Sequence, residues 1–310
     1  MIKENLDVKP FLKWAGGKRQ LLEQFEDNYP DALLKNKIDC YIEPFVGGGA
    51  VFFELVFKYD FDEIFLNDVN EELIITYKVV RDELNKLIKH LKRLEEEYLP
   101  LELEERKLVY YDTRDKFNAE KKAIDYSKMD EDAIQHASHF IFLNRTCFNG
   151  LYRQNKSGEF NVPIGRYKSP TICNEENLYA VSTALQNVKL TSCDFEEMET
   201  NIKDNTFIYL DPPYRPLPGT PSFTKYSKSD FNEESQKRLA RWYRKIDELY
   251  NKNKVYLMLS NSNPKNTDPD DNFFEKLYKG YTIEEVYAKR AINSKASKRG
   301  ELSELIIKDY

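Results

Sequence analysis

The sequence contains no run of about 18 apolar residues, so nothing in it predicts a transmembrane helix. Its first residues, 1–5, are not followed by the apolar core of a secretory signal. We therefore expect a cytoplasmic protein that has no membrane partner. The four cysteines are widely spaced and include no Cys-x-x-Cys pair, which argues against structural zinc and a disulfide framework. The three histidines form no metal-ligand pattern with neighbouring carboxylates, and we expect no metal.

A basic excess is also lacking, since the formal net charge is -6. Taken alone, this disfavours a nucleic-acid partner, because binding phosphates needs a basic surface. The positive charges are nevertheless clustered. Residues 145–168 contain five basic residues against one acidic residue, and residues 289–299 contain five basic residues and no acidic one. A globally acidic protein with two such patches can bind DNA on one face.

Short apolar runs alternate along the chain with longer segments of helical periodicity. Strands that alternate with helices indicate an open α/β sheet of the Rossmann-like type, mostly parallel. The predicted strands are 39–43, 63–66, 188–191, 206–210 and 255–260, and the predicted helices are 18–28, 49–58, 71–82, 231–251 and 272–279.

The alternation breaks between about residues 85 and 179. This stretch holds three charged helical segments, 84–98, 103–117 and 130–143, and then a loop at 144–170 that is rich in Asn, Gly and Arg. We predict a mainly helical domain at 85–179, inserted into an α/β domain formed by 1–84 and 180–310.

A glycine-rich turn follows the first predicted strand, with the sequence Glu-Pro-Phe-Val-Gly-Gly-Gly at 43–49. Glycine lets the backbone approach a ligand closely, and a helix N-terminus favours polar or anionic groups. The turn matches neither a Walker loop nor the dinucleotide-binding G-x-G-x-x-G pattern. Asp68 ends the next strand, where an acid can accept both hydroxyls of a ribose, although an N-cap for the helix at 71–82 is the alternative. Together the two features predict an adenosine-containing cofactor.

The sequence Asp-Pro-Pro-Tyr at 211–214 ends a fully apolar strand. The prolines remove two backbone donors and fix the turn. Asp211 and the following carbonyl then offer only acceptors, next to an aromatic ring, which suits an amino group on a planar base. A purely structural turn is the alternative. Near the start, Gly-Gly-Lys at 16–18 lacks the remaining residues of a phosphate-binding loop, but Trp14 and Lys18 could cover the edge of a cofactor.

These segments, in this order, resemble the alpha group of DNA adenine methyltransferases, the Dam-like enzymes, and within it the DpnM type. The resemblance rests on Phe-Leu-Lys-Trp-Ala-Gly-Gly-Lys (11–18), the glycine turn (43–49), Asn-Asp-Val-Asn (67–70) and Asp-Pro-Pro-Tyr (211–214). Segments 110–118, 144–155, 158–168 and 218–226 also resemble the family, so that nearly the whole chain is covered.

The resemblance implies S-adenosylmethionine as the cofactor, and it implies a role for particular residues. Catalysis would fall to Asp211, Pro212 and Tyr214. The cofactor would be held by Trp14, Lys18, Phe45, Gly47, Gly49, Asp68, Asp194 and Asp211.

Recognition of double-stranded DNA would fall to the insertion and to one residue before it. Lys13 and Arg153 would contact guanines, whose major-groove acceptors suit lysine and arginine. Phe148 would wedge into the base stack, although the family often has tyrosine there, and burial in the helical domain is the alternative. Asn149, Leu151, Pro163 and Arg166 would complete the DNA surface.

The predicted function is transfer of a methyl group from S-adenosylmethionine to the exocyclic amino group of a flipped-out adenine. The resemblance implies GATC as the site, with GATATC-like sites as the alternative. Methylation of a cytosine ring carbon needs a nucleophilic cysteine in a Pro-Cys motif, and no cysteine here follows a proline. Two alternatives stay open: an amino-group methyltransferase acting on RNA or protein, and a sequence-specific DNA-binding protein without catalysis. Pairing with a restriction endonuclease and solitary epigenetic marking are both compatible with the sequence.

Overall fold

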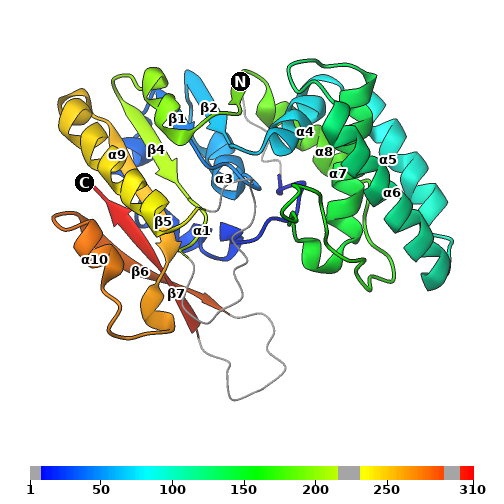
Figure 1. Ribbon diagram of the computed structural model, residues 1–310. Helices are drawn as coiled ribbons and strands as arrows, with labels where there is room; N and C mark the ends of the chain where they lie inside the picture. Colours follow the sequence, from blue (N-terminus) through cyan, green and yellow to red (C-terminus); the bar gives the residue numbers. More distant parts are fainter. Residues whose placement is uncertain (1–7, 216–230, 290–300) are drawn as a thin grey trace.

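The computed structural model of the protein describes residues 8–215, 231–289 and 301–310 (Figure 1). Its centre is a seven-stranded sheet in the order β3-β2-β1-β4-β5-β7-β6. The first five strands of this order are parallel, and β7 runs antiparallel to both β5 and β6. The strands are β1 (Cys40–Glu43), β2 (Glu63–Asn67), β3 (Val188–Thr191), β4 (Thr206–Leu210), β5 (Tyr256–Ser262), β6 (Thr282–Lys289) and β7 (Glu301–Lys308). The predicted Rossmann-like, mostly parallel sheet is confirmed.

All five predicted strands are present. The central ones are the easiest to predict, because a parallel strand buried on both faces is a continuous apolar run. Every residue of β1 and β4 is buried. The antiparallel pair β6 and β7 was not predicted. Both strands mix charged and apolar residues as Thr-Ile-Glu-Glu-Val-Tyr-Ala-Lys and Glu-Leu-Ser-Glu-Leu-Ile-Ile-Lys, without a long apolar run.

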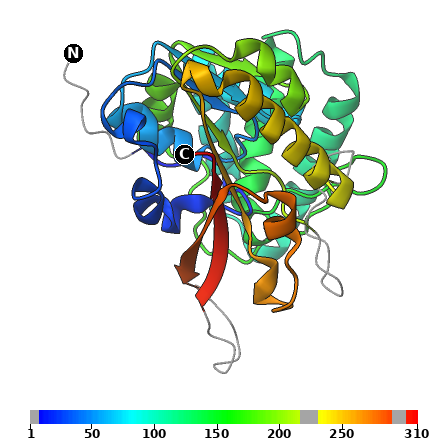
Figure 2. The same ribbon diagram turned by 90° about the vertical axis from the view of Figure 1, so that its left-hand side faces the viewer.

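Helices cover both faces of the sheet (Figure 2). On one face, Tyr41 and Phe207 pack with side chains from α1 (Leu22–Glu26), α2 (Asp31–Leu34) and α3 (Ala50–Lys58). On the other face, Ile42 and Ile208 pack with side chains from α9 (Glu233–Tyr250) and α10 (Phe273–Leu277). The helix predicted at 18–28 is wrong as a continuous element. It is divided at Leu21 into a short 3-10 helix (Lys18–Gln20) and α1. Lys18 is buried next to Asp211 at the end of β4, and Phe25 packs in the core.

The segment predicted to form an inserted domain is mainly helical from residue 84 to residue 146. It comprises α5 (Leu84–Tyr98), α6 (Leu103–Ala123) and α7 (Glu131–Thr146), which follow α4 (Glu71–Asp82) of the α/β part. Helix α7 is the centre of this bundle and packs against α4, α5 and α6, so that its apolar core is continuous with that of the α/β part. The predicted domain boundary at 179–180 falls inside α8 (Glu175–Leu185), which packs on α3, α4 and α5.

Among the described residues, no helix combines the length and the apolar character that a membrane span requires.

Candidate functional site

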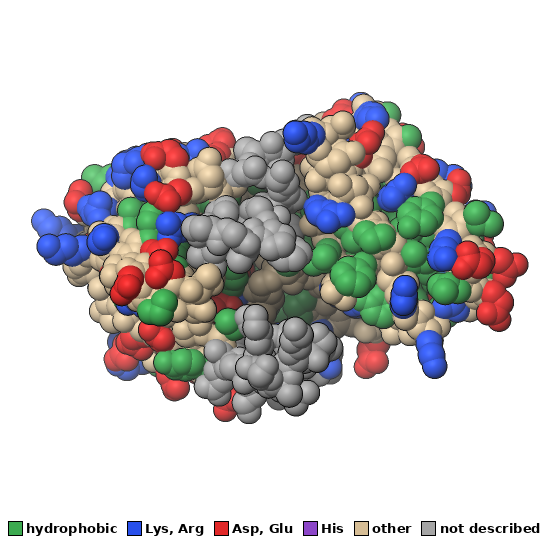
Figure 3. Space-filling model, turned by 60° about the horizontal axis from the view of Figure 1, so that its bottom comes forward, with side chains coloured by type: hydrophobic (Ala, Val, Ile, Leu, Met, Phe, Trp, Pro, Cys, Tyr) green, Lys and Arg blue, Asp and Glu red, His purple; other side chains and the backbone are tan. Residues whose placement is uncertain are grey.

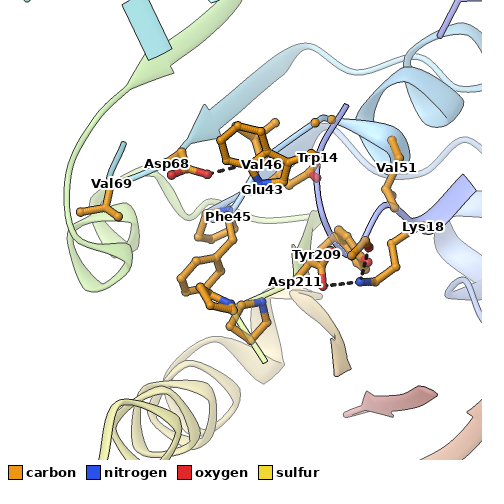
Figure 4. Close-up of a pocket in the computed structure, with 18 of the residues that line it drawn as sticks. Trp14, Lys18, Glu43, Phe45, Val46, Val51, Asp68, Val69, Tyr209 and Asp211 are labelled. Atoms are coloured by element: carbon orange, nitrogen blue, oxygen red, sulfur yellow. Dashed lines mark hydrogen bonds and ion pairs between the residues drawn. The ribbon is translucent and has the colours of Figure 1, made fainter. Parts of the chain in front are cut away.

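A cavity of about 520 Å³ opens at the carboxyl ends of β1 and β4. The strand order reverses between these two strands, because the chain proceeds outward to β2 on one side and to β5 on the other. Open α/β sheets bind ligands in the crevice at such a point. All ten residues predicted to bind the cofactor or to act in catalysis line this cavity, some of them shown in Figure 4: Trp14, Lys18, Phe45, Gly47, Gly49, Asp68, Asp194, Asp211, Pro212 and Tyr214.

The turn after β1 requires glycine at two positions. Gly47 and Gly49 have φ angles of 47° and 72°, in the left-handed region that side chains disfavour. A Cβ atom on Gly47 would lie 2.8 Å from the indole of Trp14, and one on Gly49 would lie 2.8 Å from the hydroxyl of Tyr77. The indole therefore packs directly on the backbone of the turn and forms a wall of the cavity (Figure 4).

Asp68, after β2, points toward the same turn. Its carboxylate accepts hydrogen bonds from the backbone N–H groups of Gly47 at 3.1 Å and of Asn70 at 3.0 Å. Asn70, and not Asp68, is the N-cap of α4, since its side chain accepts from the N–H of Leu73 at 3.2 Å. The capping alternative for Asp68 is therefore wrong. Burial raises the pKa of Asp68 to about 6 despite the two hydrogen bonds.

Asp211 forms an ion pair with Lys18, which is only 2% exposed. The three N–H groups of this ammonium are all used: Nζ lies 2.7 Å from Asp211 Oδ1, 2.7 Å from the hydroxyl of Tyr214 and 2.9 Å from the carbonyl of Gly16. Glu304 on β7 adds a second carboxylate at 3.5 Å. Burial acts to lower the pKa of Lys18, but Asp211, Tyr214 and Glu304 outweigh it and the pKa is raised.

The two oxygens of Asp211 have different surroundings. Oδ1 accepts from both Lys18 and the hydroxyl of Ser260, the latter at 3.2 Å. The Tyr209 hydroxyl lies 2.8 Å from Ser260 Oγ and donates to it when Ser260 donates to Asp211. Within the described part of the chain, no group donates to Oδ2. Oδ1 thus accepts from two described groups, and Oδ2 remains an available acceptor at the cavity.

Three residues of this neighbourhood were not predicted. Ser260 and Glu304 lie on β5 and β7, far along the chain from Asp211, and only the strand pairing brings them to it. Arg238, on α9, lines the cavity and pairs with Asp194. It is one of several charged residues on an amphipathic helix, so no sequence signal distinguishes it. The carboxylate of Asp194 also accepts from the N–H of Glu196 at 3.0 Å, at the start of the 3-10 helix Phe195–Asn201.

The residues predicted to bind DNA lie outside this cavity, on or beside the loop that follows α7. Phe148, Asn149, Arg153, Pro163 and Arg166 are exposed, and Leu151 and Lys13 are partly buried. Phe148 is 50% exposed, so the burial alternative for this ring is wrong. Its N–H donates to the carbonyl of Pro163 at 2.8 Å, which holds the two exposed residues side by side. The Lys13 ammonium lies 4.0 Å from the ring centre of Tyr167.

The basic cluster at 145–168 is divided by the fold. Arg145 is largely buried and donates to the carbonyl of Phe11 at 2.7 Å, which gives it a structural role. Arg153, Lys156, Arg166 and Lys168 are exposed. Figure 3 shows basic side chains mixed with hydrophobic ones on the right-hand part of the surface, where the helical segment 84–146 lies. Most of the second basic cluster, 289–299, and the segment 218–226 lie outside the described residues.

The sheet order and the cavity at the carboxyl ends of β1 and β4 are consistent with the Rossmann-like fold of methyltransferases. The chain belongs to the family of D12 class N6 adenine-specific DNA methyltransferases, whose sequence profile matches residues 14–292.

Three relatives are similar to the chain over nearly their full length. The chain is 50% identical over 306 residues to the "Type II methyltransferase M.MjaIII" of Methanocaldococcus jannaschii, covering 98% of this chain and 100% of that protein. It is 37% identical to the "Type II methyltransferase M1.LlaDCHI" of Lactococcus lactis subsp. cremoris, over 99% and 98% of the two chains. It is 32% identical to the "DNA adenine methylase" of Haemophilus influenzae, over 98% and 95%. The predicted family and enzyme class are thereby confirmed.

Proposed function

We propose that this enzyme transfers a methyl group from S-adenosylmethionine to the exocyclic amino group of a flipped-out adenine in a short double-stranded DNA site, GATC. The observation that carries the proposal is the Asp211 carboxylate. Its Oδ1 is held by Lys18 and Ser260, while no described residue donates to Oδ2 in a cavity that also contains Tyr214 and the glycine turn.

The residues of the cavity fit S-adenosylmethionine. The space that a Cβ on Gly47 would occupy is closed by Trp14, so the turn and the indole form a narrow cradle. In the proposal, Phe45, Gly47 and Gly49 line the methionine part and Asp68 accepts the ribose hydroxyls. Lys18 and Trp14, from the N-terminal segment of the chain, close one side of the cofactor site, and Asp194 contacts the adenine of the cofactor. When bound, the cofactor supplies an electrophilic methyl group on a sulfonium, a good leaving group.

The chain itself must deliver and align the adenine. Inside a duplex the amino group is out of reach, and extruding the base costs a few kcal/mol. Stacking on Tyr214 returns about 1–3 kcal/mol. The amino nitrogen is a poor nucleophile because its lone pair is delocalised into the ring. Hydrogen bonds to Asp211 and to the carbonyl of Pro212 would localise that lone pair, so alignment and electrostatic stabilisation carry the catalysis.

We propose that residues 85–179 form the target-recognition domain. Lys13 and Arg153 contact guanines, and each good bidentate contact contributes about 1–3 kcal/mol of discrimination. Phe148 inserts into the base stack, as apolar wedges do in proteins that open a duplex. The remaining DNA surface is formed by Asn149, Leu151, Pro163 and Arg166.

The names of the relatives allow two biological roles. "Type II methyltransferase" favours protection of host DNA next to a restriction endonuclease, and "DNA adenine methylase" is compatible with solitary marking. Because the substrate in both roles is cellular DNA, we place the enzyme in the cytoplasm.

The direct test is to express the protein in a host that lacks adenine methylation and to map methylated bases by sequencing. Methylated adenine in GATC is the expected result. Methylation at another short site would overturn the GATC assignment alone. Purified protein that binds duplex DNA but transfers no labelled methyl group would identify a DNA-binding protein without catalysis. Labelling of RNA or protein in place of DNA would establish the other alternative.

Affinity for the cofactor should depend on pH through Asp68. Its pKa is raised to about 6 by burial, so it is ionised at pH 7.5 and mostly protonated at pH 5. A protonated carboxyl is a poor acceptor of hydrogen bonds from the ribose hydroxyls. The affinity for S-adenosylhomocysteine is therefore expected to fall about tenfold from pH 7.5 to pH 5. Calorimetric titration measures it. Asp68→Asn should bind weakly at pH 7.5 and show little further loss at pH 5; an unchanged pH profile in this variant would assign the dependence to another group.

Arg153→Ala is expected to relax specificity at one base position more than it weakens binding to random DNA. A base contact changes discrimination by about 1–3 kcal/mol, whereas a phosphate contact weakens binding to every sequence and lowers the salt slope by about one. Methylation rates on the mapped site and its single-base variants, at two salt concentrations, distinguish the two. Lys156→Ala is the control for an exposed charge of the same loop. A uniform loss with a shallower salt slope would place Arg153 on the backbone.

A further inference from the structure

A buried polar cluster connects the catalytic part to the insertion. Its centre is the carboxylate of Glu72 on α4, which is only 3% exposed. One oxygen forms an ion pair with Lys121 of α6, and the other accepts a hydrogen bond from the hydroxyl of Tyr152. The Nε2 group of Gln154 donates to that same hydroxyl. Removing one partner of a buried charge pair is costly, so the cluster fixes Tyr152 against α4.

The ring of Tyr152 lies against the wall of the cofactor cavity. It stacks on the indole of Trp14 with ring centres 5.6 Å apart and an interplanar angle of 16°. Gly47 of the glycine turn also contacts this indole. Trp14 therefore touches both the cofactor turn and Tyr152, and a ligand that restricts the indole also restricts the ring behind it.

The next residue along the chain is Arg153. Tyr152 and Gln154 are buried while Arg153 between them is exposed, as expected for an extended segment with a period of two. The segment is closed by an antiparallel bridge between Gln154 and Phe160. The guanidinium itself is aimed by Asn161, since Nε donates to Oδ1 at 2.8 Å and Nη2 donates to the carbonyl at 3.2 Å.

We propose that Tyr152 is a positioning residue that couples occupancy of the cofactor cavity to the placement of Arg153 on DNA. This inference rests on the proposed function. A ligand at the glycine turn restricts the indole of Trp14, and the indole in turn restricts the stacked ring of Tyr152. The backbone at Arg153 is then fixed by its two buried neighbours, Tyr152 and Gln154. Coupling between two sites is reciprocal, so a bound recognition site should raise affinity for the cofactor by the same factor.

The experiment measures the affinity of the whole protein for two duplexes, one carrying the mapped site and one with a single base changed, by fluorescence anisotropy. Each is measured without and with saturating S-adenosylhomocysteine. In the wild type, the ligand should raise the ratio of the two affinities at least about fivefold, the lower end of typical coupling. Tyr152→Leu should abolish this increase while its affinity for S-adenosylhomocysteine changes less than about threefold. Tyr152→Phe, which keeps the stacked ring, should retain most of it.

Tyr110→Phe is the matched control. Tyr110 is also buried in the insertion, and its hydroxyl donates to the carbonyl of Val162 at 2.8 Å in the same loop, but its ring packs on Tyr111. This variant should keep the full increase. An unchanged increase in Tyr152→Leu, or an equal loss in Tyr110→Phe, would overturn the proposal. If Tyr152→Leu does not fold, Tyr152→Met, whose unbranched side chain adapts better to an irregular space, takes its place.

Failure of the two proposals can be told apart. A wild type that neither binds S-adenosylhomocysteine nor methylates DNA overturns the proposed function. A wild type that does both, without any ligand-dependent increase in discrimination, overturns only the role of Tyr152.

Discussion

Asp211→Ala is expected to lower the rate of methyl transfer by at least about 10²–10³-fold, the usual effect of removing one preorganised group that stabilises developing charge. The proposed work of Asp211 is to accept the target amino group through Oδ2, the oxygen to which no described residue donates. Water entering the alanine variant can accept the same hydrogen bonds but is not held in place. Single-turnover transfer of labelled methyl groups to a saturating duplex measures the loss.

The fold should survive this substitution because Lys18 keeps a counter-charge. A buried ammonium without a partner costs about 3–5 kcal/mol, but Glu304 still lies 3.5 Å from Nζ. The thermal midpoint and the affinity for duplex DNA should therefore remain close to those of the wild type.

Asp271→Ala provides the control for losing an ion pair near the same motif. Asp271 lies 2.6 Å from Arg215, just beyond the Asp-Pro-Pro-Tyr sequence, and does not line the cavity. This variant should keep most of its activity. Turnover of Asp211→Ala near the wild-type level would contradict the proposed mechanism.

The parts of the fold that could be predicted are those in which burial leaves a local pattern. The strand at 206–210 is a run of buried residues because both sheet faces are covered, and β4 occupies the same residues. Helices α4 and α5 begin and end close to where their periodicity predicts. Glycine residues with positive φ mark the turn at Gly47 and Gly49 in the same way, because few other residues tolerate that backbone.

The parts that could not be predicted depend on pairing between distant segments. Glu304 looks like one more surface charge in Glu-Leu-Ser-Glu-Leu, and only the insertion of β7 between β5 and β6 brings it to Lys18. Ser260 looks like the polar end of a strand, yet it donates to Asp211. Arg145 belongs to a basic cluster in the sequence, but the fold turns it inward to the carbonyl of Phe11.

The hydroxyl of Tyr214 is the clearest such case. From the sequence, Tyr214 offers a ring on which a base can stack, and the hydroxyl has no evident role. In the structure the hydroxyl accepts a hydrogen bond from Lys18 at 2.7 Å, and the same ammonium holds Asp211. The ring and the carboxylate are thus fixed relative to each other by one cation, which a linear motif does not reveal.

Tyr214→Ala is expected to lower the rate about 5–150-fold, because base–aromatic stacking contributes about 1–3 kcal/mol. Tyr214→Phe keeps the stacking face and loses the contacts of the hydroxyl with Lys18 and Glu304. Lys18 retains its bonds to Asp211 and Gly16, so the rate in this variant should fall no more than a few-fold. Both variants are compared with the wild type under single-turnover conditions on the same duplex.

A second substrate separates stacking from general damage to the site. When the target adenine is mismatched, extruding it from the duplex costs less free energy. The flipped state is then populated even without the stacking energy that Tyr214 contributes. The defect of Tyr214→Ala should therefore shrink on a mismatched duplex, while the small defect of Tyr214→Phe should stay the same. Equal losses in both variants, on both duplexes, would instead mean that the hydroxyl acts through Lys18 and that the aromatic face contributes little to holding the base.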